Sequence, residues 1–182
     1  FKGSPALGEH VIRRLPELGF DVSHARDLGE GQSIGHPFGF ANTRLLRDQP
    51  LEASWLPVIL NASYPPNTPP PSRAYDFGVA LAEAVRSWPE NLRVGVLTIG
   101  NFSHPVLDEA LDRRLFAAIE KNDVDALRSL PRSNFEGGNG QAKTWIVAAA
   151  MLSHLRMHPL DYVACYRSAA STGCGMPFAY WD

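Results

Sequence analysis

A chain of 182 residues is long enough for one domain with a sizeable hydrophobic core. Its net charge of −2, with no basic stripe, argues against a nucleic-acid partner, and no apolar run is long enough to cross a bilayer. We expect no secretory signal, and the two cysteines, Cys165 and Cys174, lack the spacing of a metal site. We therefore expect a cytoplasmic protein with reduced thiols and no membrane contact.

The N-terminal part of the chain predicts a helix followed by a short strand. An apolar stripe recurs at helical spacing over residues 1–19, with Pro5 near its start and Gly19 at its end. Residues 20–22 are then expected to form a short strand, and residues 41–47 one or two helical turns.

A glycine-rich segment, residues 28–40, holds His36 between a glycine and a proline. Ile34, Phe38 and Phe40 are apolar and would hold this segment against the body of the protein. A loop fixed in this way can present a functional histidine, whereas a flexible loop would leave His36 solvated.

A second buried strand is predicted over residues 54–63, followed at once by a proline-rich stretch and a helix over 72–87. Five prolines within residues 64–71 preset an extended path, and a rigid loop between strand and helix shapes a cleft. Polar side chains that could contact a substrate lie at its two ends: Asn61, Tyr64 and Arg73. Arg73 could pair with a substrate carboxylate in a bidentate manner, or it could be an ordinary surface arginine.

The run over residues 93–112 is the centre of the predicted fold. An apolar, β-branched stretch ends at Gly100, and a helix begins near Asp108. The polar tip between them carries His104. Ligands bind outside the carboxyl ends of strands in open α/β sheets, so His104 is placed for proton exchange or metal binding. The alternative is that His104 only caps the helix or bonds to a loop carbonyl.

The rest of the chain continues the alternation of helices and strands. Helices are expected over 107–121, 123–130 and 141–155, with Asp123 as the cap of the second. A loop is expected over 131–140, a strand over 160–166, and a packed tail over 173–182. His154 and His158 are interpreted as surface histidines near a helix end. The pattern predicts a single α/β domain over 1–182, a three-layer sandwich with a central, mostly parallel sheet flanked by helices.

Three segments together resemble a known family. In order they are LNASYPPNTPPPSRAYDFGVAL, VLTIGNFSHPVLDEALDRRL and GNGQAKTWIVAAA. They resemble the catalytic B subunit of class III extradiol ring-cleavage dioxygenases, the LigB-like superfamily of protocatechuate 4,5-dioxygenase type. The most specific piece is the Gly-x-x-Ser-His-x-x-x-Asp-Glu run that follows the proline-rich loop.

This resemblance implies opening of a catechol-type ring by O2 with a non-haem Fe(II), held by two histidines and a glutamate. His104 matches the family's acid/base histidine, and His36 falls where the family carries a further histidine in a glycine-rich loop. The implied partners are a small aromatic substrate, O2, and either a second copy of the chain or a small second subunit.

The sequence departs from the family pattern at three places. The chain is expected to begin after the N-terminal strand that carries the family's two iron-binding histidines. Gln141 stands at the glutamate ligand position, and an amide carbonyl is a weaker Fe(II) ligand than a carboxylate. Phe102 replaces a smaller residue, where it would narrow the pocket or stack on an aromatic substrate.

Two hypotheses follow from these residues. The first is an Fe(II)-dependent extradiol-type dioxygenase that uses His104 as acid/base. The second is a LigB-like homologue with an altered or lost iron site, which acts as a non-catalytic partner subunit or as a non-oxidative enzyme on aromatic acids.

Overall fold

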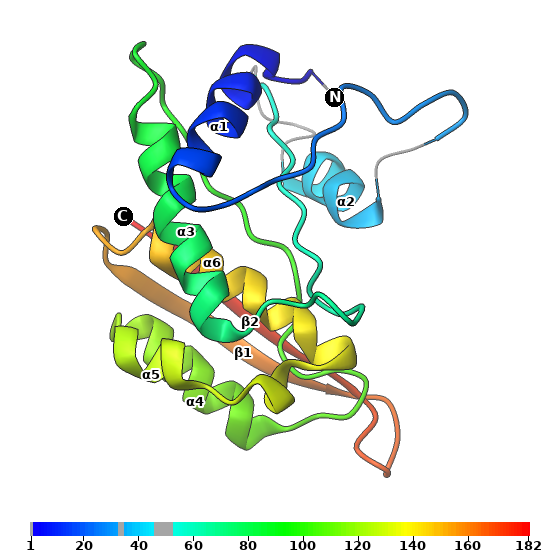
Figure 1. Ribbon diagram of the computed structural model, residues 1–182. Helices are drawn as coiled ribbons and strands as arrows, with labels where there is room; N and C mark the ends of the chain where they lie inside the picture. Colours follow the sequence, from blue (N-terminus) through cyan, green and yellow to red (C-terminus); the bar gives the residue numbers. More distant parts are fainter. Residues whose placement is uncertain (1, 33–34, 46–52) are drawn as a thin grey trace. The chain divides into compact units, whose positions relative to one another are not determined.

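The computed structural model describes residues 2–32, 35–45 and 53–182 (Figure 1). The chain divides into two compact units, Phe1–Ile59 with Glu83–Gly95, and Leu60–Ala82 with Val96–Asp182. A compact unit need not fold on its own, so the single domain predicted over 1–182 stays a prediction. No helix in the described ranges is both long and apolar enough to cross a membrane.

The smaller unit contains helix α1 (Pro5–Glu17), which confirms the predicted N-terminal helix. Its buried face is formed by Leu7, Val11 and Leu15, at the spacing of one helical stripe. On another face, His10 Nε2 lies 3.1 Å from the carbonyl oxygen of Ala84.

Helix α2 (His36–Leu45) begins earlier than predicted. The sequence assigned residues 28–40 to a loop, but Pro37 suits the first turn of a helix, because its fixed φ is already helical. Ile34 and the end of the segment predicted over 41–47 lie outside the described residues.

Three predicted strands are present only as extended segments. Residues 20–22, 54–63 and 93–99 have no strand ladder, apart from one bridge between Gly3 and Trp55. Five of their apolar side chains are exposed: Val58, Ile59, Val94, Leu97 and Ile99. A β-branched run favours an extended backbone but does not specify its hydrogen-bonding neighbour. The protein is mixed helix and strand as predicted, but the central parallel sheet is not shown.

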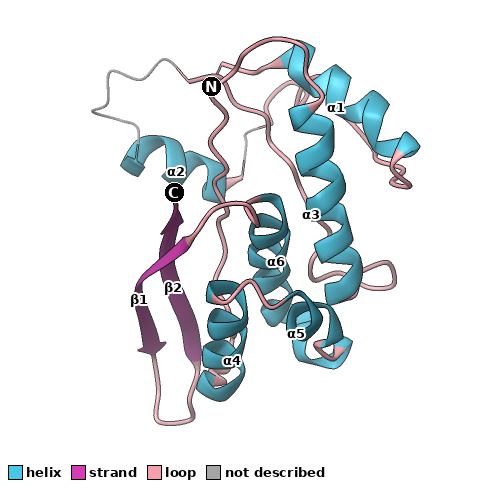
Figure 2. Cartoon of the chain, turned by 90° about the vertical axis from the view of Figure 1, so that its left-hand side faces the viewer, coloured by secondary structure: helices cyan, strands magenta, loops and turns pink. Residues whose placement is uncertain are grey.

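The strands that do pair within the described ranges are β1 (Met157–Tyr166) and β2 (Gly173–Trp181). They form an antiparallel hairpin whose register runs from Met157↔Trp181 to Tyr166↔Gly173. This confirms the strand predicted over 160–166, and it shows that the tail expected only to pack on the body is itself a strand. Helix α4 (Glu109–Glu120) packs against the hairpin (Figure 2).

The helices of the larger unit agree with the predicted positions; α3 begins and ends one residue earlier than predicted, and the others are shorter. They are α3 (Pro71–Arg86, whose last turn belongs to the smaller unit), α5 (Val124–Ser129) and α6 (Lys143–Met151). Two 3-10 turns, η1 (Arg132–Phe135) and η2 (Gly137–Ala142), replace the predicted loop and the first residues of the last helix. Asp123 caps α5 as predicted, because its carboxylate accepts from the backbone N–H of Ala126 at 3.0 Å.

The core of the larger unit lies between α4, α5, α6 and the hairpin. Its fully buried large side chains include Phe102, Leu115, Phe135 and Ile146. Each such side chain contributes roughly 1.5–3 kcal/mol by leaving water. Phe102 comes from the segment just before His104, so the core anchors that segment directly.

Helices α3 and α6 approach closely at Gly78. A Cβ atom added there would lie 2.4 Å from the carbonyl oxygen of Val147 and 2.7 Å from Ala150 Cβ. We expect Gly78→Ala to lower the free energy of unfolding by about 1–3 kcal/mol, because the two helices would have to separate. Urea unfolding followed by circular dichroism measures the change.

Gly39→Ala is the matched control, since Gly39 is also helical and a Cβ there meets nothing within 4 Å. Alanine is the better helix former, so this variant should be neutral or slightly stabilised. Equal stability of the two variants would contradict the close contact between α3 and α6.

Candidate functional site

The segment that carries His104 runs along β2 and is held there by backbone hydrogen bonds. The backbone N–H of Phe102 donates to the carbonyl of Gly175 at 2.8 Å, and Gly175 N–H donates to the carbonyl of Ser103 at 3.0 Å. Further along, Gly173 N–H donates to the carbonyl of Pro105 at 2.8 Å. His104 therefore lies on a fixed backbone rather than on a free loop tip.

The imidazole of His104 is half-buried and held in one orientation. Its Nδ1 lies 3.0 Å from the carbonyl oxygen of Gly173. A carbonyl can only accept, so in the neutral form of the ring Nδ1 carries the proton and Nε2 keeps its lone pair. On the other side, the backbone N–H of His104 donates to Asn139 Oδ1 at 2.7 Å. This tautomer leaves Nε2 as the nitrogen that can accept a proton.

The three segments that carry the family resemblance meet around η2. A Cβ on Gly138 would lie 2.9 Å from His104 Cδ2, and one on Gly140 would lie 2.0 Å from the carbonyl oxygen of Ala62. Only glycines allow η2 to pass this closely between the histidine segment and the start of the proline-rich loop. Gln141 follows directly in the same turn.

A buried carboxylate organises the segment before His104. Asp112, on α4, is 1% exposed. Its Oδ1 accepts from Ser103 N–H at 2.9 Å, and its Oδ2 accepts from Ser103 Oγ at 2.6 Å and from the Tyr162 hydroxyl at 2.7 Å. A Cβ on Gly175 would lie 2.0 Å from Oδ2. The carboxylate therefore ties together the histidine segment, α4 and β1.

The electrostatics of this network keep Tyr162 protonated. Burial raises the pKa of Asp112, while the donors on Ser103 and Tyr162 oppose that rise by stabilising the ionised form. Burial, together with the hydrogen bond and charge of Asp112, raises the pKa of Tyr162. The tyrosine therefore acts as a permanent donor at neutral pH.

The predicted substrate-binding residues of the proline-rich loop have different surroundings. Asn61 Nδ2 donates to the carbonyl of Tyr64 at 2.7 Å and to Asn67 Oδ1 at 2.6 Å, so its amide is engaged in the turn. Tyr64 is 80% exposed, and Arg73 is exposed in the first turn of α3. Tyr64 and Arg73 therefore have side chains accessible from solvent.

Phe102 is buried in the core of the larger unit. Its ring is 0% exposed and packs edge-to-face on Phe116 and Trp145, with centroids 5.9 and 5.5 Å away. It supports the histidine segment from the core side. The sequence showed an aromatic residue beside the histidine but not which way its ring points.

The remaining predicted residues are Gln141 and His36. The Gln141 side chain is exposed, and its backbone carbonyl accepts from Thr144 Oγ1 at 2.8 Å. His36 begins α2 in the smaller unit, where its ring meets Phe40 with centroids 6.1 Å apart. The other predicted site residues all belong to the larger unit.

Lys143 was not predicted from the sequence. It is 0% exposed at the start of α6, and its Nζ has no hydrogen-bond partner among the residues that the structure describes. Burial lowers the pKa of Lys143, and the charge of Arg132 lowers it further. A lysine in the first turn of an alanine-rich helix gives no sequence signal that separates it from a surface lysine.

The described residues do not provide a ligand set for iron. Within 2–32, 35–45 and 53–182 there is no group of three or more His, Cys, Asp or Glu side chains that could hold a metal ion.

His158, interpreted from sequence as a surface histidine, is half-buried on β1, bonds to Asp182 Oδ1 at 2.6 Å and stacks on Tyr180.

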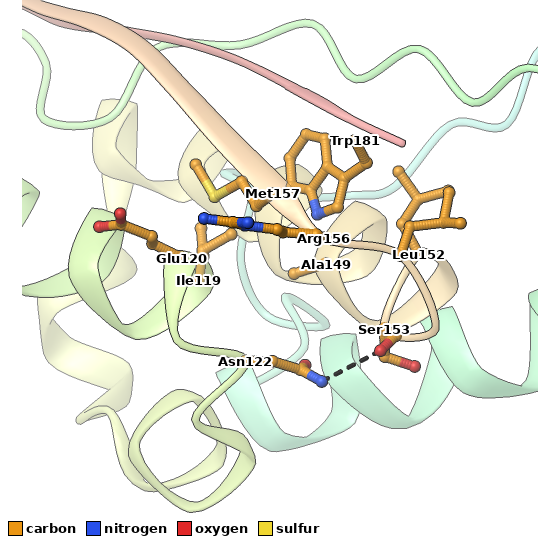
Figure 3. Close-up of a pocket in the computed structure, with 10 residues that line it drawn as sticks. Ile119, Glu120, Asn122, Ala149, Leu152, Ser153, Arg156, Met157 and Trp181 are labelled. Carbon is orange, nitrogen blue, oxygen red and sulfur yellow. Dashed lines mark hydrogen bonds between the residues drawn. The ribbon is translucent and has the colours of Figure 1, made fainter.

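One cavity of the larger unit lies away from His104. It has a volume of about 190 Å³ and lies at the Met157–Trp181 end of the hairpin (Figure 3). His104 is held at the Gly173 end. A second, of about 250 Å³, lies beside His10 and Trp88 in the smaller unit. Both are smaller than the usual pocket for a drug-sized ligand. Neither is lined by a predicted site residue.

Comparison with known proteins agrees with the resemblance. A family model described as the catalytic LigB subunit of aromatic ring-opening dioxygenase matches residues 1–171. The chain is also 32% identical over 165 residues to gallate dioxygenase of Pseudomonas putida, covering 83% of this chain and 46% of that enzyme. The chain thus spans about half the length of this curated relative.

The Asp112 network predicts a specific effect of removing one hydroxyl. Tyr162→Phe should let the Asp112 carboxylate and the histidine segment move, so that His104 no longer keeps one tautomer. Nitrogen-15 NMR of the imidazole measures this. The wild type should show a protonated Nδ1 and an unprotonated Nε2, and the variant should show a mixture.

Tyr166→Phe is the matched control. Tyr166 lies on the same strand, and its hydroxyl donates to Glu109 Oε1 at 2.8 Å rather than to Asp112. This variant should keep the wild-type imidazole spectrum. An unchanged spectrum in Tyr162→Phe as well would show that the network does not orient His104.

The isolated Lys143 ammonium predicts a pH-dependent stability. Because its folded-state pKa is lowered, the unfolded chain binds this proton more tightly, so stability should rise with pH up to the ordinary lysine range near 10.5. Lys143→Met should remove that rise and increase the free energy of unfolding at pH 7 by about 1–3 kcal/mol. Urea unfolding at several pH values measures both.

Lys121→Met serves as the control, because Lys121 is exposed just after α4. It should change stability by no more than about 0.5 kcal/mol. A loss of stability in Lys143→Met at pH 7 would mean that the ammonium has a stabilising partner.

Proposed function

The chain belongs to the family of catalytic LigB subunits of aromatic ring-opening dioxygenases, and from this premise we propose that it acts in opening a catechol-type ring with O2. The observation that carries the proposal is His104, which is held on a fixed backbone with Nε2 free to take a proton. The relative named gallate dioxygenase suggests an aromatic acid with adjacent hydroxyls as the substrate class.

In this proposal His104 is the acid/base group. Nε2 accepts a proton from a ring hydroxyl as the substrate becomes more electron-rich, and it returns a proton later in the reaction. The bond from Nδ1–H to the carbonyl of Gly173 stabilises the imidazolium that forms in between. The neighbouring backbone bond to Asn139 keeps the ring in place during both transfers.

The proline-rich loop is proposed to contact the substrate. Arg73 suits a carboxylate through two parallel N–H···O bonds, and Tyr64 offers an exposed ring and hydroxyl. Asn61 and Phe102 are proposed to shape this region, Asn61 through the loop turn and Phe102 from the core. His36, in the smaller unit, is proposed as a further functional histidine, as the family resemblance implies.

LigB-family dioxygenases generally use Fe(II), which would activate O2 and the catechol when bound. The described residues do not fit this ion as a set, since no cluster of three ligand side chains occurs among them. Gln141, at the family's glutamate position, is exposed and neutral. The steps proposed above are therefore those of the chain's own side chains, and none passes through iron.

These observations also favour a second candidate function. A LigB-like homologue with an altered iron site could bind aromatic acids and move protons through His104 without oxidation, or serve as a partner subunit. Gln141 and the lack of a ligand cluster in the described ranges favour this candidate. The His104 geometry serves both candidates equally.

We expect His104→Ala to lower the rate of ring opening by about 10²–10⁴-fold, because one positioned acid/base group contributes that much. Oxygen uptake with gallate, protocatechuate and catechol measures the rate in the purified protein. His158→Gln is the control, since His158 lies near the opposite end of the hairpin from Gly173 and should leave the rate unchanged. Equal rates in His104→Ala and the wild type would contradict the assignment.

Iron analysis and ligand binding separate the two candidates. Near-stoichiometric iron with gallate-dependent oxygen uptake supports the dioxygenase. Protein that lacks iron, takes up no oxygen after loading with Fe(II), and still binds gallate in calorimetry supports the non-oxidative homologue.

A further inference from the structure

The only two cysteines of the chain face each other across the hairpin. Cys165 on β1 is the register partner of Cys174 on β2, with eight residues between them in the sequence. Both are free thiols in the structure. The spacing of the two cysteines in the sequence does not match a metal site, but the antiparallel register places them opposite each other.

The backbone pattern puts this pair at a distance that suits a disulfide. Gly173 and Gly175 direct their backbone N–H groups away from β1, toward Pro105 and Ser103. The pair between them, Cys165 and Cys174, is therefore the one whose backbone groups bond across the hairpin. Such pairs have Cα atoms about 5.5 Å apart, within the range that disulfides span.

The two thiols lie on the face of the hairpin opposite α4. Tyr162 and Gly175 both lie against Asp112 of α4. Because side chains alternate between the two faces of a strand, Cys165 and Cys174 point to the opposite face. Cys165 is exposed and Cys174 is half-buried. A soluble oxidant can therefore reach Cys165 without unfolding.

We propose that Cys165 and Cys174 form a reversible intramolecular disulfide when the protein meets a hydroperoxide. The Cys165 thiolate attacks the outer oxygen of the peroxide, which gives a sulfenic acid and releases water or an alcohol. The Cys174 sulfur then attacks the sulfenic sulfur and a second water leaves. The two thiols lose two electrons and two protons in total, and the peroxide takes up both electrons.

The order of the two steps follows from the surroundings of each thiol. Burial and the neighbouring Cys165 thiol raise the pKa of Cys174, so it is the poorer first nucleophile. Its position beside Cys165 suits it to resolve the sulfenic acid instead. Neither strand has to shift for the two sulfurs to bond, because the register already places Cys165 opposite Cys174.

The disulfide would change the orientation of the His104 imidazole. Gly173, next to Cys174, accepts the hydrogen bond from His104 Nδ1, and a Cβ on Gly173 would lie 2.0 Å from the carbonyl oxygen of Cys165. These groups are in close contact, so formation of the disulfide moves the carbonyl of Gly173, which orients the imidazole of His104. The formation of the bridge does not depend on the proposed function, whereas its effect on catalysis does.

The test is oxidation of the purified protein with one equivalent of hydrogen peroxide. Intact-mass spectrometry should show loss of two hydrogens in the monomer, no free thiol should react with maleimide, and dithiothreitol should reverse both. Peptide mapping should place the bridge between residues 165 and 174. The nitrogen-15 signals of the His104 imidazole should shift on oxidation and return on reduction.

Cys165→Ser and Cys174→Ser are the controls, and neither residue belongs to the proposed catalytic group. The Cys174→Ser variant should trap a sulfenic acid that dimedone captures, and its His104 signals should not shift. Disulfide-linked dimers alone, or sulfinic acid without a bridge, would overturn the proposed bridge. A bridge that leaves the His104 signals unchanged would overturn the coupling. Ring opening is not measured, so these outcomes are independent of the proposed function.

Discussion

The buried carboxylate of Asp112 is the constraint on which the candidate site depends. An ionised carboxylate without partners would cost several kcal/mol inside a protein, and here three donors offset that cost. Two donors come from Ser103 and one from Tyr162, so a helix, a strand and the histidine segment must keep their mutual positions. If any one of them moved, buried polar groups would lose their partners.

This constraint explains how a half-exposed histidine can be ordered. His104 follows Ser103, which is locked to Asp112, and its own backbone bonds to Asn139. The side chain then needs one bond, to the carbonyl of Gly173, to choose a tautomer. The preorganisation is thus carried mostly by the backbone, and little rotamer entropy remains to be lost when a substrate binds.

Local patterns in the sequence predicted what depends on local physics. The amphipathic periods gave α1, α3 and α4, and Asp123 was expected as a cap because one short side chain decides it. Partners far apart in the chain were not predictable: Tyr162 reaches Asp112 across 50 residues, and the β1–β2 register alone pairs Cys165 with Cys174. The run over 93–99 has the composition of a buried strand, yet no residue in it specifies a neighbouring strand. Phe102 and Lys143 show the same limit, since side-chain direction and burial are tertiary properties.

The charges around η2 bear on the class of ligand. The charge of Arg132 adds to the electrostatic cost of the buried Lys143 ammonium, and Glu136 offsets part of that cost. The family resemblance assigns position 141 to a glutamate ligand, and the neutral amide of Gln141 gives this turn less negative charge than a glutamate would. Less negative charge weakens the attraction for a divalent cation and strengthens that for an anion. Under the proposed function, a neutral residue at position 141 would therefore disfavour iron and favour the carboxylate of an aromatic acid, so that binding of the acid is the property that both proposed candidates share.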